Sequence, residues 1–227
     1  MKKEINTWQD LLMYLDDQSE GIKWNQFYTA RDKPAPFLKY RTLPDKMLVE
    51  FLKAHQVCQA VEFGCGEGRN AIYLGRQNIP VVAFDLSEIA IAFAKERAKD
   101  CHLHQTVFVA GDIFQYDFHE FSCDLVIDSG LFHHLTPHRR LVYLELLKHI
   151  LKKDGYFILL CMTEAEGEVD DSDFYGQRQV GTGFSKERLQ RFFGQDFDFV
   201  FIRQGEDIIT DTYQENSFVY CCLLKRR

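Results

Sequence analysis

The stretch Val61-Glu62-Phe63-Gly64-Cys65-Gly66-Glu67-Gly68-Arg69-Asn70 decides the fold of this chain of 227 residues. Apolar residues at its start predict the end of a buried strand, and residues 70–74 begin a helical pattern. Because glycine lacks a Cβ atom, the three alternate glycines allow the backbone to turn sharply and a ligand to lie against it. The start of a helix also offers free N–H groups to anionic or electron-rich ligand atoms. The stretch is therefore typical of a nucleotide-type site, although glycine turns that bind nothing are also common.

A second predicted strand, 80–84, ends at Asp85. In βαβ units that bind dinucleotides, an acid about 20 residues after the first glycine holds the ribose hydroxyls, and Asp85 has this position. An alternative is that Asp85 only begins the next helix together with Ser87, because both residue types are good N-caps. The glycine turn and Asp85 together favour a nucleotide-type ligand.

The glycine spacing narrows the class of ligand. A dinucleotide site needs Gly-x-Gly-x-x-Gly so that a pyrophosphate can sit on the helix end. Here Arg69 stands where the last glycine would be, and Gly68 comes one residue early, which disfavours an NAD-dependent dehydrogenase. The pattern Glu62-x-Gly64-x-Gly66-x-Gly68 resembles motif I of the class I S-adenosylmethionine-dependent methyltransferases. The resemblance implies S-adenosylmethionine as the cofactor, a ligand without phosphates.

The composition predicts a protein of the cytoplasm with one α/β domain. Hydrophobic residues make up 46% of the chain, enough for a full core. The chain contains no run of 18 apolar residues, so no membrane span is predicted. The N-terminus is polar, unlike a signal peptide. A net charge of −7 argues against nucleic acid as the main partner. The seven cysteines include no Cys-x-x-Cys pair, which predicts free thiols in a reducing compartment.

Apolar runs that alternate with helical patterns predict a parallel sheet with helices on both faces. The predicted strands are 59–63, 80–84, 106–110, 124–128, 156–162, 197–202 and 217–224. The predicted helices include 87–99, 138–152, one that starts at Pro44 and one capped by Ser185. Asp154-Gly155 is expected to stop helix 138–152. The connection 205–216 is short for a helical crossover, so the last two strands should form an antiparallel hairpin. Residues 163–183 are predicted to be a loop.

This order of elements resembles the class I methyltransferase fold from about residue 40 to the C-terminus. The resemblance implies a doubly wound, Rossmann-like α/β fold with seven strands, mostly parallel, in which the last strand is antiparallel and inserted beside the fifth. Within the family, the chain is most similar to small-molecule methyltransferases of the ubiquinone-biosynthesis, tellurite-resistance and thiopurine type. We divide it into an N-terminal helix and lid segment, 1–40, and an S-adenosylmethionine-binding methyltransferase domain, 41–227.

The N-terminal segment has two interpretations. Thr7 is a predicted N-cap, and Trp8, Leu11, Leu12 and Leu15 follow at helical spacing. The stretch 24–37 is aromatic and basic and is interrupted by two prolines. It either packs over the core or forms a lid on the cofactor, with Tyr28 and Arg31 at the methionine end. Guanidinium offers a two-pronged match to the methionine carboxylate, which favours Arg31 for that contact.

The resemblance also implies roles for residues that follow the predicted strands. The methionine part would be lined by Glu62, Gly64, Cys65, Gly66 and Gly68. Asp85 would hold the ribose, Leu86 would flank the adenine, and Gly111, Asp112 and Ile113 would form the adenine motif. Asp128, Ser129 and Leu131 would face the sulfonium and its methyl group. Two alternatives remain: Cys65 is only a small residue that fits the turn, and Asp112 is only a turn residue.

The expected function is methyl transfer to a small-molecule acceptor through an O, N or S nucleophile. A hydroxyl or protonated amine needs a base, for which His133, His134 and Tyr28 are candidates, whereas a thiol or soft anion needs none. Two adjacent histidines are a weak metal signal, so no metal is expected. The predicted fourth strand is not followed by the Asn-Pro-Pro-Tyr-like stretch of DNA amino-methyltransferases. The alternatives are binding of cofactor or partner without turnover and a protein methyltransferase; the oligomeric state is left open.

Overall fold

The computed structural model describes residues 5–17, 24–29, 42–101, 103, 105–164, 171, 183–205 and 219–227. Its strands are β1 (Ala60–Phe63), β2 (Val81–Asp85), β3 (Thr106–Ala110), β4 (Cys123–Ser129), β5 (Leu151–Met162), β6 (Phe197–Gln204) and β7 (Val219–Arg226). Its α-helices are α1 (Trp8–Asp17), α2 (Trp24–Thr29), α3 (Lys46–Ala54), α4 (Arg69–Arg76), α5 (Glu88–Ala98), α6 (Pro137–Ile150) and α7 (Lys186–Phe193). Short 3-10 turns include η3 (Ile113–Gln115) and η4 (Phe132–His134).

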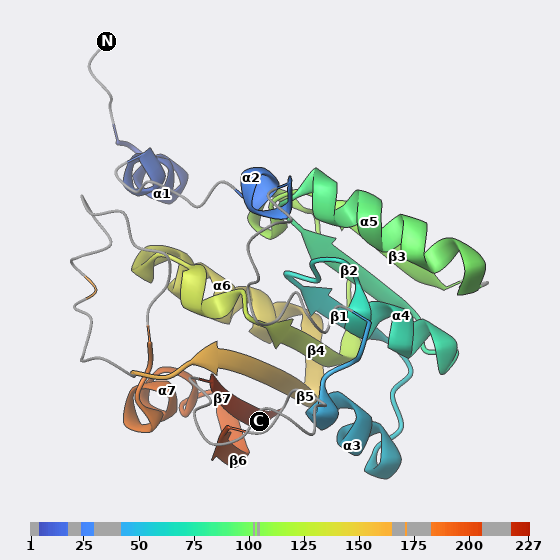
Figure 1. Cartoon of the computed structure of the whole chain (residues 1–227). Coiled ribbons are helices and arrows are strands. Elements are labelled where there is room, and N and C mark those ends of the chain that lie inside the picture. The colour runs from blue at the N-terminus through green and yellow to red at the C-terminus, as the bar shows by residue number, and fades with distance from the viewer. Residues whose placement is uncertain are drawn as a thin grey trace.

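The strands form one sheet in the order β3-β2-β1-β4-β5-β7-β6 (Figure 1). β1 to β5 pair in parallel, and β7 pairs antiparallel with both β5 and β6. The predicted seven-stranded, mostly parallel sheet is thus confirmed. The inserted last strand and the antiparallel terminal hairpin are confirmed as well.

Two hydrophobic cores lie on opposite faces of the sheet, because successive side chains of a strand point to opposite faces. In β4, Val126 packs into the core shared with α6 and α7, whereas Leu125 and Ile127 pack into the core shared with α3, α4 and α5. All three side chains are completely buried. Helices therefore cover both faces of the sheet, as expected of a doubly wound fold.

The boundary between α6 and β5 differs from the prediction. Asp154-Gly155 was expected to stop a helix, but α6 ends at Ile150 and β5 begins with the next residue. Leu151 is completely buried and pairs with Cys123 of β4, with a register irregularity before Leu125. Asp154 adopts a left-handed φ of 64° within this irregular part of the strand. Long-range pairing of Leu151 therefore overrides the local stop signal.

Polar contacts join both N-terminal helices to the domain. Thr7 caps the N-terminus of α1, as predicted. Its Oγ1 accepts a hydrogen bond from Asp10 N at 3.1 Å, and Asp10 Oδ2 accepts one from Thr7 N at 2.8 Å. α1 buries none of its side chains and lies apart from the sheet (Figure 1). α2 lies beside α5, where Ser87 Oγ donates to Asn25 Oδ1 at 2.8 Å. None of the helices in the described part of the chain combines the length and apolar character needed to span a bilayer.

Candidate active site

The glycine turn lies between β1 and α4, as predicted. Gly64, Gly66 and Gly68 have φ values of +67°, +54° and +77°, a region that residues with a side chain rarely adopt. A Cβ atom at Gly66 would lie 2.7 Å from Tyr28 Oη, and one at Gly68 would lie 2.7 Å from an edge carbon of Phe108. Both the backbone conformation and the close neighbours therefore require glycine in this turn.

Asp85 ties the end of β2 to the glycine turn. Its Oδ2 accepts a hydrogen bond from Gly66 N and its Oδ1 accepts one from Ser87 N, both at 2.8 Å. Ser87 is the N-cap of α5 and accepts from Ala90 N, so the capping role belongs to Ser87 and not to Asp85. Burial raises the pKa of Asp85, whereas the two backbone donors lower it. The side chain is 8% exposed, at the edge of the sheet where the ribose acid was expected.

Glu62 belongs to a buried polar network that the sequence did not predict. Its Oε1 accepts from Asn70 Nδ2 and its Oε2 accepts from Ala71 N, both at 3.0 Å. Asn70 also donates to Asp45 Oδ2 at 2.8 Å, which connects the start of α4 to the start of α3. Burial raises the pKa of Glu62 to about 8, although Asn70 acts in the opposite direction. The network holds the glycine turn against the core.

Arg69 spans the rim of the site. Its Nη1 lies 2.5 Å from Asp45 Oδ1, and its Nη2 donates to Ser129 Oγ at 2.6 Å. Ser129 is the last residue of β4, so this arginine joins the N-terminus of α3 to the carboxyl end of the central strand. This role of Arg69 is not predicted from the sequence, because its two partners are distant along the chain.

Asp128 is buried in the core, and its carboxylate shapes the loop after β4. Oδ1 accepts from the amides of Gly130, Leu131 and Phe132 at 3.1, 2.7 and 3.3 Å, and Oδ2 accepts from Tyr143 Oη at 2.7 Å. The carboxylate is therefore hydrogen-bonded to the loop and to α6, and its expected place facing the sulfonium stays a prediction. The loop itself reaches the glycine turn, because Leu131 Cβ lies 2.8 Å from the position of a Cβ atom at Gly64.

The Asp128 carboxyl group should make stability depend on pH. Burial raises its pKa to about 6 from the ordinary value of 3.8, against the lowering effect of Tyr143 and the loop amides. A carboxyl group with a higher pKa in the folded state stabilises the fold while it is protonated, and this contribution is lost as the pH rises through about 6. A shift of about two units corresponds to roughly 3 kcal/mol.

We therefore expect the free energy of unfolding to fall by up to about 3 kcal/mol between about pH 4 and pH 7, relative to the Asp128→Asn variant. Urea denaturation of both proteins over this range measures the difference. Glu62, whose pKa is raised to about 8, also makes stability fall with pH, but both proteins carry it, so its contribution cancels in the comparison. Parallel pH profiles of the two proteins would contradict the assignment to Asp128.

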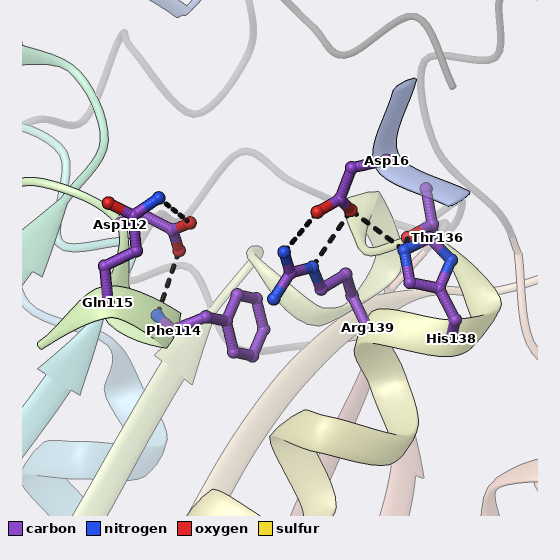
Figure 2. A network of polar contacts seen from close by, with 7 residues as sticks. All are labelled: Asp16, Asp112, Phe114, Gln115, Thr136, His138 and Arg139. Carbon is purple, nitrogen blue, oxygen red and sulfur yellow. Dashed lines mark hydrogen bonds and ion pairs between the residues drawn. The ribbon is translucent and has the colours of Figure 1, made fainter. Parts of the chain in front are cut away.

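The predicted adenine motif forms a capped turn. Asp112 Oδ1 accepts from Phe114 N at 2.9 Å, and its Oδ2 accepts from Gln115 Nε2 at 3.4 Å (Figure 2). The turn role considered as an alternative for Asp112 is thus present, and a second role at adenine stays a prediction. Ile113 is buried, Leu86 is 57% exposed, and a Cβ atom at Gly111 would meet none of the described residues within 4 Å. No atom of the described residues therefore crowds this side of Gly111.

α1 contacts the same region through α6. Asp16 Oδ1 lies 2.8 Å from His138 Nε2 and accepts from Arg139 Nε at 3.0 Å. The Arg139 guanidinium carbon lies 4.8 Å from the centre of the Phe114 ring. Figure 2 draws both side chains. α1 is therefore joined through Arg139 to Phe114, the residue that follows the predicted adenine motif.

Tyr28 of α2 lies directly over the glycine turn, as the distance from its Oη to Gly66 shows. Burial and the charge of Asp85 raise the pKa of the Tyr28 phenol, so the hydroxyl stays protonated at neutral pH. This protonation makes Tyr28 a donor and disfavours it as the base. Arg31, the other predicted lid residue, lies outside the described residues, as do most of 163–183.

His133 is the remaining candidate base with a suitable environment. It is 8% exposed, and its Cε1 lies 3.5 Å from the position of a Cβ atom at Gly130. Burial, followed by the neighbouring His134 and Arg140, lowers the pKa of His133 well below its usual value, so the imidazole is neutral. Its Nδ1 has no hydrogen-bond partner among the described residues. His134 instead packs edge-on against Trp24 of α2, with ring centres 4.8 Å apart.

Activity is expected to survive chelation. Within the described ranges, no group of three His, Cys, Asp or Glu side chains could hold a metal ion. The measurement is turnover before and after treatment with EDTA and dialysis. A stoichiometric metal whose removal abolishes turnover would contradict this prediction.

Comparison with known proteins assigns the domain. Residues 60–155 match the family model described as a methyltransferase domain. A relative from Mycobacteroides abscessus, named 2-heptyl-1-hydroxyquinolin-4(1H)-one methyltransferase, is 28% identical over 118 residues, which are 52% of this chain and 51% of that protein. The match thus spans about half the length of the relative.

Solved structures share the fold. The PH0226 protein of Pyrococcus horikoshii has a TM-score of 0.66 and 17% identity, over 91% of this chain and 100% of its own. TehB of Haemophilus influenzae has a TM-score of 0.59 and 18% identity, over 80% of this chain and 61% of its own. The fold and the glycine turn are those of a Rossmann-like methyltransferase domain. Residues 60–155 thus match a methyltransferase domain, and the chain is similar to S-adenosylmethionine-dependent methyltransferases, in agreement with the class I family that its motif resembles.

Proposed function

We propose that the protein transfers the methyl group of S-adenosylmethionine to a small-molecule acceptor. The observation that carries this proposal is the hydrogen bond from Gly66 N to Asp85 at the carboxyl edge of the sheet, where Gly111 N donates to Asp85 O. Ligands of open α/β sheets bind at this edge. The name of the Mycobacteroides relative supports a small-molecule acceptor over a nucleic acid or a protein.

The proposed cofactor contacts follow the sequence assignment. The methionine part would lie against Glu62, Gly64, Cys65, Gly66 and Gly68, with Tyr28 above it and Arg31 at its carboxylate. The ribose would be held by Asp85, and the adenine by Leu86, Gly111, Asp112 and Ile113. Asp128 acts through the loop that it shapes, which presents Ser129 and Leu131 at the transfer site.

The cofactor supplies an electrophilic methyl group on a sulfonium, and the chain supplies alignment and a dry environment. Well-oriented reactants can gain on the order of 7–11 kcal/mol from alignment alone. Neutral His133 would accept the proton of a hydroxyl or protonated amine at Nδ1. A thiol or soft anion would react without it. We also propose a cytoplasmic location, because the seven cysteines form no disulfide.

The test uses methyl-labelled S-adenosylmethionine with 2-heptyl-1-hydroxyquinolin-4(1H)-one as the first acceptor, followed by a panel of phenols, amines and thiols. We expect a labelled small-molecule product and binding of S-adenosylhomocysteine. Binding without any labelled product would favour a cofactor-binding protein without turnover. Label recovered only in polypeptides of a cell extract would favour a protein methyltransferase.

The α2 segment is expected to close over the cofactor. Tyr28 Oη already lies over the glycine turn, and Asn25 accepts from Ser87 at the start of α5. Hydrogen exchange at residues 24–29 should slow when S-adenosylhomocysteine binds, because the ligand fills the space beneath this helix. α1, residues 8–17, is the control and should change less. In binding assays, Arg31→Ala should weaken the affinity, whereas Lys33→Ala should not; equal protection of 24–29 in both states would contradict closure.

A further inference from the structure

A second polar cluster lies at the carboxyl end of β5, next to the proposed transfer site. Phe184 N donates to Met162 O at 2.9 Å, and Phe184 forms a parallel bridge with Thr163. The Phe184 ring is 1% exposed and lies 5.1 Å from the ring of Phe132, which directly precedes His133. The backbone of β5 and the loop after β4 thus fix the position of this ring.

Two arginines from different helices converge over the Phe184 ring. The guanidinium carbons of Arg140, from α6, and Arg188, from α7, lie 5.0 and 4.8 Å from the ring centre. Arg140 Nη1 and Arg188 Nη2 both contact Asp171 Oδ1, at 2.6 and 2.5 Å. Because both groups reach the same oxygen, they define one position at which an oxyanion is held by two cations.

The three charged side chains differ strongly in exposure. The side chain of Arg140 is 3% exposed and that of Arg188 is 20% exposed, whereas that of Asp171 is 45% exposed. Arginine keeps its charge, and two guanidinium groups this close repel each other unless an anion lies between them. Packing therefore holds the two arginines in place, whereas the more exposed Asp171 carboxylate can be replaced by the oxyanion of a ligand.

The cluster is also close to the proposed base. Arg140 contributes to the lowered pKa of His133, and His133 lies against Gly130 at the end of β4. A molecule with its nucleophile near His133 would therefore extend toward Arg140 and Arg188. Guanidinium groups match carboxylates and related oxyanions with charge-assisted hydrogen bonds.

We infer that Arg140 and Arg188 bind an oxyanion group of the methyl acceptor, and that the Asp171 carboxylate occupies this position while the acceptor is absent. The inference rests on the proposed function and deepens it, because it restricts the acceptor to molecules that carry an anionic oxygen group. Asp171 acts as an internal competitor in this scheme. Its removal should increase affinity for an external oxyanion.

The test measures binding of benzoate by calorimetry, with benzamide as the uncharged probe of the same shape. Asp171→Asn should bind benzoate about tenfold more tightly than the parent, a factor that corresponds to about 1.4 kcal/mol, with no change for benzamide. Adding Arg188→Gln should abolish this gain. Adding Arg191→Gln, an exposed arginine of the same helix, should leave it intact.

Equal benzoate affinity of the parent and folded Asp171→Asn would overturn the inference, as would a gain that survives Arg188→Gln. If Asp171→Asn does not fold, benzoate binding by the parent tests the subsite. Saturable binding that is lost in Arg188→Gln and kept in Arg191→Gln supports the subsite. Absence of saturable binding refutes it. Titration of the same samples with S-adenosylhomocysteine separates the two proposals. Cofactor binding without benzoate binding refutes the subsite alone, whereas benzoate binding without cofactor binding refutes the proposed function alone.

Discussion

Replacement of Asp85 by asparagine is expected to weaken the binding of S-adenosylhomocysteine by about ten- to a hundredfold. The two carboxylate oxygens of Asp85 accept from Gly66 N and Ser87 N. An asparagine would place its NH2 group against one of these N–H donors, which disturbs the turn. The proposed ribose contact would also lose its charge, and hydrogen bonds to charged groups contribute about 1.5–3 kcal/mol. Calorimetric titration of both proteins measures the difference.

Asp124 offers a matched control. Its Oδ2 accepts from the backbone N–H groups of Cys58 and Gln59, both at 2.9 Å, and it lies at the opposite end of β4 from the site. Asp124→Asn should therefore affect stability but leave the cofactor affinity nearly unchanged. Unchanged affinity in folded Asp85→Asn would remove the ribose role, and tight binding of NAD by the parent would contradict the family's cofactor.

The sheet could be predicted because its strands are buried on both faces. Such strands are nearly continuous runs of apolar residues, and the glycine turn marks where the first one ends. The α6–β5 boundary could not be predicted in this way. Asp154-Gly155 carries a strong local stop signal, whereas the pairing of Leu151 with Cys123 depends on a residue far away in the sequence.

The positions of the site residues were easier to predict than their contacts. Asp85 and Asp128 follow buried strands, so their place at the carboxyl edge of the sheet follows from the pattern. Their hydrogen-bond partners cannot be predicted in this way. Tyr143, for example, donates to Asp128 from α6, and no sequence pattern links a position on this helix to a position on β4. The same holds for Arg69, which joins Asp45 to Ser129. A buried acid next to a strand end has two possible uses, in the core or toward a ligand, and the sequence pattern is the same for both.

The arginine pair at Phe184 illustrates the same limit. Arg140 and Arg188 lie on separate helices, and the sequence around each resembles an ordinary solvated helix face. Their convergence depends on the bridge between Thr163 and Phe184, which brings the start of α7 to the end of β5. With His133 on one side and the arginine pair on the other, the acceptor site would combine a neutral base with a cationic subsite. A hydroxyl nucleophile on an anionic molecule suits this combination.

Replacement of His133 by glutamine is expected to lower kcat for a hydroxyl acceptor by about a hundred- to ten-thousandfold, the range typical of a lost general base. Burial lowers the pKa of His133 well below its usual value, so the neutral form is present throughout the neutral range. The parent's kcat should accordingly be flat near pH 7 and fall only in acid. Affinity for S-adenosylhomocysteine should stay within about twofold, because glutamine is uncharged and His133 is proposed to act on the acceptor.

His134→Gln is the matched control for this prediction, since His134 packs against Trp24 and is expected to change kcat far less. Added imidazole should restore part of the activity of His133→Gln but not alter the parent, because a small base can enter the space that the ring leaves. The assay follows labelled methyl transfer to a hydroxyl acceptor found in the panel described under Proposed function. A His133→Gln variant that folds, binds the cofactor and keeps most of the parent's kcat would show that no base is needed. The nucleophile would then be a thiol or an anion that is already deprotonated.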